Sequence, residues 1–95
     1  MADLYYMYVE GEDIAASLEA AGHWVRHVHL ADSNRLLPGL GHIDFVTAFR
    51  TLREIGYISD LSLECNYPGG EPDWEVLAQC GHYLARCLEE VGVVR

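Results

Sequence analysis

The chain has 95 residues, about half of them apolar, which is enough for one small domain or part of a larger one. Its net charge of −9 disfavours nucleic acids and anionic membrane surfaces as partners, because both require a basic face. No apolar run is long enough to span a bilayer, and the N-terminus lacks the pattern of a signal peptide. We therefore expect a soluble, cytoplasmic protein.

The basic and sulfur-containing residues exclude further classes of chemistry. All six basic residues are arginines, so this chain cannot supply the lysine of a Schiff base or a P-loop. The three cysteines, Cys65, Cys80 and Cys87, form no CxxC pair. An odd number without that spacing favours free thiols in a reducing compartment over a disulfide.

The first half of the chain predicts two strands around one helix. Residues 2–8 are rich in tyrosine and predict the end of a β-strand. The acidic residues 10–13 precede apolar residues at helical spacing, which predicts a helix that ends at Gly22. The apolar run at residues 24–31 predicts a buried strand.

The second half repeats this alternation. Asp44 is expected to cap a helix that ends at Gly56, and residues 60–65 predict a second short strand after it. Residues 66–74 predict a loop, and Pro72 is expected to open the longest helix. One apolar face of that helix is predicted to contain Trp74, Leu77, Ala78, Gly81, Leu84, Ala85, Leu88 and Val91.

The resulting order, β-α-β-α-β-α, predicts an α/β fold of three βα units with parallel strands. Three short parallel strands leave two exposed edges and one poorly covered face. Residues 1–95 are therefore expected to form a single partial domain, the closing part of a larger α/β structure.

Polar side chains are expected at one edge of this sheet. Side chains alternate across a strand, so His29 and Glu64 should point to the face opposite the leucines and valines, at the carboxyl ends of their strands. Asp3, near the end of the first strand, can join them. An Asp, His and Glu set suits Mn²⁺, Mg²⁺ or Co²⁺.

Parity alone leaves simpler interpretations open. His29 can be a hydrogen-bonded histidine beside the sheet, Glu64 a carboxylate facing water, and Asp3 part of an ordered terminus. His27 is expected to pack against or support His29 rather than to bind a metal.

The segment HVHLADSNRLLPGLGHIDF, together with FRTLREIGYISDLSLEC, resembles the last two strands of the xylose-isomerase-like TIM barrels. This superfamily includes sugar phosphate isomerases and epimerases, ketose 3-epimerases such as D-tagatose 3-epimerase, and hydroxypyruvate isomerase. The epimerase pattern is His-x-x-(Asp/Glu)-x-Asn-Arg-x-x-Pro-Gly-x-Gly, followed by a glutamate at the end of a strand. The matching residues here are His29, Asp32, Asn34, Arg35, Pro38, Gly39, Gly41 and Glu64.

The resemblance implies a (β/α)₈ barrel of which this chain supplies units 6–8, and a divalent metal bound by Glu, Asp, His and Glu. Asp3, His29 and Glu64 match the last three ligands. Glu64 also matches one of two glutamates that act as acid and base, and Arg35 matches an arginine that contacts substrate oxygens. Asp32 and Asn34 match supporting positions of the loop. The implied substrate is a small sugar or hydroxy-ketone.

The sequence also departs from the family pattern. The first metal-binding glutamate, which is the other acid/base, would lie upstream of Met1. The epimerases have a substrate-contacting histidine three residues after the aspartate, where this chain has Tyr6. A tyrosine can also donate a hydrogen bond, so Tyr6 is expected to bind substrate at this position. A TIM barrel needs roughly 250 residues. We therefore expect the isolated chain to be inactive.

Three hypotheses follow from these features. The first is the C-terminal part of a metal-dependent sugar isomerase or epimerase. The second is a non-catalytic module that associates with itself, as a homo-oligomer, or with the missing N-terminal part through its exposed sheet edges. The third, which the absence of CxxC disfavours, is a small metal-binding or redox protein.

Overall fold

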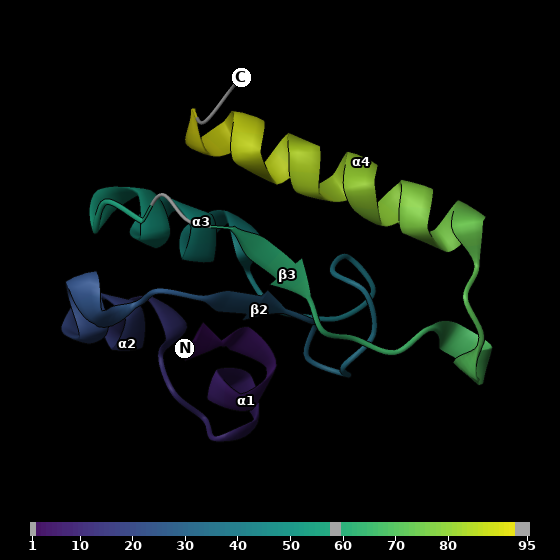
Figure 1. The fold of residues 1–95 in the computed structure, drawn as a ribbon, viewed down its shortest axis with the longest axis horizontal. Helices are drawn as coiled ribbons and strands as arrows, with labels where there is room; N and C mark the ends of the chain where they lie inside the picture. The colour runs from purple at the N-terminus through teal and green to yellow at the C-terminus, as the bar shows by residue number, and fades with distance from the viewer. Residues whose placement is uncertain (1, 58–59, 93–95) are drawn as a thin grey trace.

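A computed structural model describes residues 2–57 and 60–92. Its centre is a three-stranded sheet in the order β1-β2-β3, with β1 at Ala2–Asp3, β2 at Val28–Leu30 and β3 at Leu61–Leu63. Both strand pairs are parallel, and helices connect successive strands (Figure 1). The predicted α/β fold of three βα units is therefore confirmed.

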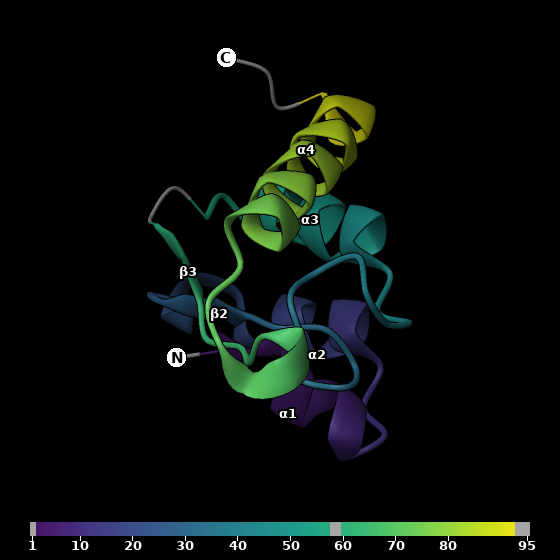
Figure 2. The same cartoon turned by 90° about the vertical axis from the view of Figure 1, so that its right-hand side faces the viewer.

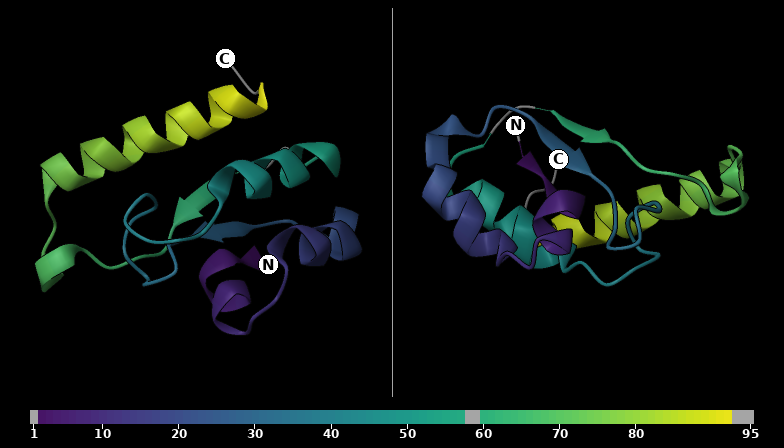
Figure 3. Two further views of the ribbon diagram at one scale, coloured as in Figure 1. Left: turned by 180° about the vertical axis from the view of Figure 1, so that it is seen from behind. Right: turned by 90° about the horizontal axis from the view of Figure 1, so that it is seen from below.

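The helices pack as a layer on one face of this sheet. Figure 2 shows β2 and β3 on one side of the molecule, with α2 (Ile14–Ala21) and α3 (Phe45–Glu54) on the other. Helix α3 contacts both α2 and α4, and α4 (Trp74–Val91) lies along its outer side, as both views of Figure 3 show.

The helices α2 and α3 begin and end where the sequence predicts. The Asp13 side chain accepts the Ala16 N–H at the start of α2, and the Asp44 side chain accepts the Thr47 N–H at the start of α3. A side-chain oxygen satisfies an N–H that has no partner within the helix. Gly22 lies directly after α2 with a φ of 51°, a value that favours glycine.

The prediction of a strand over residues 2–8 is wrong beyond Asp3. Residues Leu4–Val9 form a short helix, α1. The Asp3 side chain accepts the Tyr6 N–H at 3.1 Å and so caps this helix. The β-propensity of the tyrosines is therefore outweighed by a cap and by burial of Leu4, which is fully buried in the core.

The other two strands are shorter than predicted. A 3₁₀ turn at Gly22–Trp24 includes Trp24, the first residue of the predicted strand 24–31, and only Val28–Leu30 pair as β2. Of the predicted strand 60–65, Leu61–Leu63 pair as β3. An apolar run predicts a strand but does not predict how many of its residues pair with a neighbouring strand.

Helix α4 begins at Trp74, two residues later than predicted, and turns only part of its predicted apolar face to the protein. Asp73, rather than Pro72, precedes it, and its side chain accepts the Glu75 and Val76 N–H groups. Trp74 is 79% exposed, and Ala78, Gly81 and Ala85 of the predicted apolar face are also exposed. Leu84, Leu88 and Val91 of the same predicted face pack in or against the core. The residues that the helix does bury are Cys80, Cys87 and Val91.

The hydrophobic core lies between β2 and the helices. Val28 and Leu30 point into it from the sheet, and Leu18 and Phe45 meet them from α2 and α3. The corresponding leucines of β3 are less covered, since Leu61 and Leu63 are 37% and 41% exposed.

The described part of the chain contains no helix that is both long and apolar enough to cross a membrane.

Candidate functional site

The predicted site residues Asp3 and His29 meet at the carboxyl ends of β1 and β2. These two residues are partners in the parallel register, so their side chains project from neighbouring strands to the same face. His29 Nδ1 lies 3.9 Å from Asp3 Oδ2, which is too long for a hydrogen bond. A protonated His29 would form an ion pair with this carboxylate. Both side chains remain partly exposed.

Glu64 lies on the same face but is not grouped with this pair. Ser62 is in register with His29, and Glu64 follows it by two residues. The Glu64 N–H donates to the Leu30 carbonyl at 3.0 Å, which continues the sheet to its carboxyl end. The glutamate is exposed. Within residues 2–57 and 60–92, no three His, Cys, Asp or Glu side chains are close enough together to hold a metal.

His27, predicted to support His29, contacts the first strand through its backbone. Its carbonyl accepts the Ala2 N–H at 2.8 Å, which helps to fix β1 beside β2. The residue itself is exposed.

The loop that follows β2 is built around the carboxylate of Asp32. This residue is 1% exposed. Its Oδ1 accepts the N–H groups of Ser33 and Ile43 at 2.8 and 2.9 Å, and its Oδ2 accepts the N–H of Gly39 at 2.8 Å. A buried carboxylate is stable only when such donors satisfy it. Asp32 therefore fixes the path of the loop from the inside.

Two further residues hold the same loop closed. Asn34 Nδ2 donates to the Leu40 carbonyl at 2.8 Å, and its Oδ1 accepts the Leu36 N–H at 3.1 Å. Gly41 has no room for a side chain, because a Cβ there would lie 2.6 Å from Asp32 Oδ1. The Asn and the glycines of the motif thus have a structural role in the loop.

Arg35 projects from this loop towards α1. Its φ of 65° is the only positive value at a non-glycine residue in the described part of the chain. Its Nη1 donates to the hydroxyl of Tyr6 at 3.2 Å, and this hydrogen bond raises the pKa of the guanidinium. The two residues predicted to contact substrate are therefore in contact with each other.

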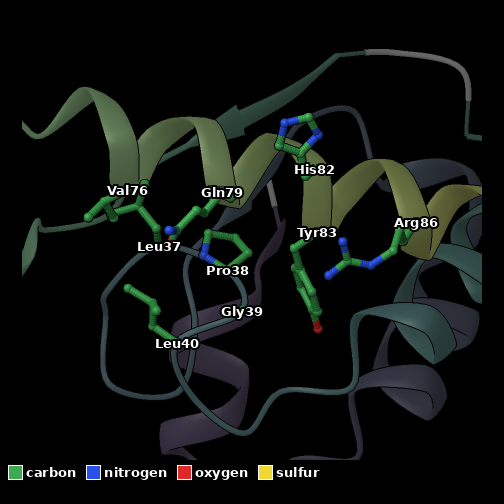
Figure 4. Close-up of a pocket in the computed structure, with 10 residues that line it drawn as sticks. Leu37, Pro38, Gly39, Leu40, Val76, Gln79, His82, Tyr83 and Arg86 are labelled. Carbon is green, nitrogen blue, oxygen red and sulfur yellow. The ribbon is translucent and has the colours of Figure 1, made fainter.

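A cavity of about 440 Å³ lies between this loop and α4 (Figure 4). Leu37 and Leu40 line it from the loop, and Tyr83 and Arg86 from the helix. Burial raises the pKa of Tyr83, and it raises the pKa of Cys80, another lining residue, to about 11. None of the predicted site residues lines this cavity, which lies behind the loop that bears Arg35. All three cysteines have free thiols, as the sequence predicts.

Sequence reasoning missed Tyr5, whose ring lies 5.2 Å from the Arg35 guanidinium carbon. Two adjacent tyrosines close to the predicted metal-binding aspartate could have indicated that both lie at the site. The predicted strand, however, places adjacent side chains on opposite faces of the sheet.

A parallel sheet with helices on one face and polar side chains at the carboxyl ends of its strands defines an α/β protein of the barrel or open-sheet class. The sequence model of the xylose isomerase-like TIM barrel family matches residues 1–86, and the chain belongs to that family.

The relatives are sugar epimerases. The chain is 36% identical over 62 residues to L-ribulose 3-epimerase of Mesorhizobium japonicum, a match that covers 65% of this chain and 21% of the relative. It superposes on 3-keto-D-glucoside 4-epimerase from E. coli with a TM-score of 0.82 and 29% identity, covering 90% of this chain and 32% of the other. The D-psicose 3-epimerase of Clostridium cellulolyticum H10, solved with D-tagatose, gives a TM-score of 0.63 at 32% identity, covering 66% of this chain and 22% of the other. The chain thus spans about a fifth to a third of the proteins it matches.

Proposed function

We propose that this chain is the C-terminal part of a divalent-metal-dependent sugar isomerase or epimerase that transfers a proton next to a carbonyl group. The observation that supports it best is the register between β1 and β2, in which Asp3 and His29 are neighbours with their side chains 3.9 Å apart. The similarity to ketose 3-epimerases supports the reaction class.

The donors present fit a divalent cation such as Mn²⁺, Mg²⁺ or Co²⁺. Carboxylate oxygen and imidazole nitrogen suit these ions, and neither side chain is buried away from the open face. Asp3 and His29 would hold the ion, and Glu64 would join them as a third ligand after a shift of the end of β3, because the three side chains are not close enough together in this structure. A bound divalent ion polarises carbonyl and hydroxyl oxygens of a sugar.

The protein side chains divide the remaining work. The Glu64 carboxylate is exposed at the strand end, where it can accept a proton from the carbon beside a carbonyl and return it. Arg35 and Tyr6 would bind the substrate oxygens, because both offer hydrogen-bond donors at the same end of the sheet.

We propose that the isolated chain does not turn over sugars. Among residues 2–57 and 60–92, Glu64 is the one residue assigned as acid/base at the sheet end, and epimerisation needs an acid and a base on opposite sides of the reacting carbon. The complete site would form on association with a chain or segment that supplies the upstream barrel units.

Activity measurements test this proposal directly. The purified chain is incubated with Mn²⁺ and D-psicose or L-ribulose, alone and mixed with the N-terminal five units of a related epimerase. We expect turnover only in the mixture, and its loss when the chain bears Glu64→Gln. Turnover by the chain alone, or none in any mixture that forms a stable complex, would contradict the proposal.

The partly exposed Leu61 and Leu63 of β3 favour a second candidate, a module that associates with copies of itself. Sedimentation at several concentrations separates the two. Self-association that Leu63→Thr abolishes would support the second candidate, and a monomer at all concentrations would contradict it.

A further inference from the structure

The guanidinium of Arg35 is held by two adjacent tyrosines of α1. Its carbon Cζ lies 5.2 Å from the ring centroid of Tyr5 and 5.4 Å from that of Tyr6. Both distances are within the range of cation–π attraction. The two rings stand edge to face, at 67° with centroids 5.2 Å apart, so they form one aromatic corner rather than two separate contacts.

The backbone of Arg35 is fixed as well. Its N–H donates to the Asp32 carbonyl at 2.8 Å, and its carbonyl accepts the Asn66 N–H at 2.8 Å. The left-handed backbone conformation costs free energy for a residue other than glycine, and it persists only where the surrounding contacts enforce it. The side chain therefore starts from a defined position before the tyrosines orient its end.

The tyrosines are themselves positioned by the candidate metal ligand. The Asp3 carboxylate accepts the Tyr6 N–H at 3.1 Å and so fixes the first turn of α1. One oxygen of this carboxylate thus anchors the tyrosines and the other faces His29. The arginine corner and the Asp3–His29 pair are connected through a single side chain.

We propose that Tyr5 and Tyr6 are positioning residues that hold Arg35 as a pre-oriented donor group beside the Asp3–His29 pair. The proposal rests on the proposed function in that it takes Arg35 as the residue that contacts substrate. Tyr5 acts through its ring alone, whereas Tyr6 acts through its ring and its hydroxyl.

This arrangement also sets what the corner can bind. A hydroxyl that accepts from Arg35 turns its own hydrogen away from the guanidinium, so Tyr6 becomes a second donor. The other guanidinium N–H groups point in the same fixed fork. The corner therefore recognises acceptor oxygens of a ligand, and pre-orientation lowers the entropy lost when the ligand binds.

The reaction of individual arginines with phenylglyoxal tests the proposal without metal or sugar. Peptide mapping by mass spectrometry gives the rate for each arginine in the native chain and in Tyr6→Phe, Tyr5→Leu and Tyr5→Phe. We expect Tyr5→Leu, which removes a cation–π contact, to raise the Arg35 rate by about two- to fivefold. Tyr6→Phe keeps the ring and removes the hydrogen bond to the hydroxyl, so we expect it to raise the rate by about two- to tenfold. Tyr5→Phe keeps the ring and should restore the native rate.

The same samples contain their own controls. The exposed Arg26 and Arg50 should react equally in all variants. Arg53 donates to the Val91 carbonyl at the end of α4, so a faster reaction of Arg53 would report unfolding. In NMR spectra, the Arg35 Nη signals should be separate in the native chain and should merge in Tyr6→Phe.

An Arg35 rate that is unchanged in Tyr6→Phe and Tyr5→Leu would overturn the proposal. So would an equal increase in Tyr5→Leu and Tyr5→Phe, since the ring would then not matter. Neither result would affect metal binding by Asp3 and His29, which a metal titration measures separately.

Discussion

Replacing Asp32 by asparagine should destabilise the protein, although the two side chains have nearly the same shape. The native carboxylate is 1% exposed and accepts three backbone N–H groups. An asparagine that keeps its oxygen towards Ser33 and Ile43 must turn its NH₂ group towards the Gly39 N–H, which then loses its acceptor. Two donors would therefore face each other inside the loop.

The magnitude follows from the contacts. An orphaned buried donor costs about 1–3 kcal/mol, and the two remaining bonds weaken when the charge is removed, so we expect a loss of about 2–4 kcal/mol. That is a large share of the roughly 5–15 kcal/mol that stabilises a domain. Urea unfolding followed by circular dichroism measures the loss, and hydrogen exchange at Gly39 and Ile43 shows whether the loop opens first.

The matched control is Asp13→Asn. Asp13 is exposed and caps α2 through one N–H, that of Ala16. Asparagine caps helices about as well as aspartate, so this change should cost less than about 0.5 kcal/mol. If Asp32→Asn costs no more than the control and exchange at Gly39 and Ile43 stays slow, the role assigned to the buried carboxylate is refuted.

Three further predictions follow from the structure. Gly41→Ala should lower the free energy of unfolding in urea by about 1–3 kcal/mol, because its Cβ would lie 2.6 Å from two side-chain oxygens. Gly81→Ala on the exposed face of α4 adds a Cβ that meets no atom within 4 Å beyond its own helix backbone and chain neighbours, and it should stabilise the protein by about 0.5–1 kcal/mol. The reverse order of the two effects would contradict the loop geometry. Hydrogen bonds from the Thr47 hydroxyl and N–H lower the pKa of Asp44 below its ordinary value. The stability that Asp44 contributes is therefore present above about pH 4 and is lost as the pH falls through its folded pKa. Asp44→Asn should reduce the urea midpoint at pH 7 and have less effect at pH 3, and equal effects at both pH values would contradict this prediction. Burial raises the pKa of Cys80 from 9.0 to about 11. At pH 8 this thiol should therefore react with a disulfide reagent roughly a hundredfold more slowly in the folded chain than in urea. Similar rates in both states would show that the folded chain leaves the thiol accessible and would contradict its burial.

The helices α2 and α3 were predictable because their end signals are local. Asp13 and Asp44 each cap the helix that follows, and Gly22 lies directly after the end of α2. These interactions need no knowledge of the rest of the fold.

The segment Leu4–Val9 was not predictable in the same way. Its tyrosines favour strands, and what makes it a helix is the Asp3 cap together with burial of Leu4 and the contact of Tyr6 with Arg35, 29 residues away. The face that α4 buries is equally non-local. Its apolar residues allowed more than one buried stripe, and α4 packs against α3 with Cys80, Cys87 and Val91 buried, of which Val91 alone was on the predicted face.

The candidate site divides along the same line. Strand parity was sufficient to predict that Asp3 and His29 share a face, because the alternation of side chains is a property of any strand. The role of Asp32 needed the closed loop, whose donors Gly39 and Ile43 come from positions 7 and 11 residues further on. The placement of Glu64 apart from the pair depends on how far β3 extends, which its sequence does not indicate.

Asp3 and His29 are proposed as two ligands of one divalent metal ion. Titration of the chain with Mn²⁺ in a calorimeter tests this assignment, with Asp3→Asn, His29→Gln and Glu64→Gln as variants. Asparagine can still cap α1, so Asp3→Asn removes a ligand oxygen without removing the cap. We predict one bound ion per chain, lost in Asp3→Asn and in His29→Gln and weakened in Glu64→Gln, with His82→Gln on the exposed side of α4 binding as the native chain does. Binding that survives both Asp3→Asn and His29→Gln, or no binding to the native chain, would contradict the assignment of Asp3 and His29 as metal ligands.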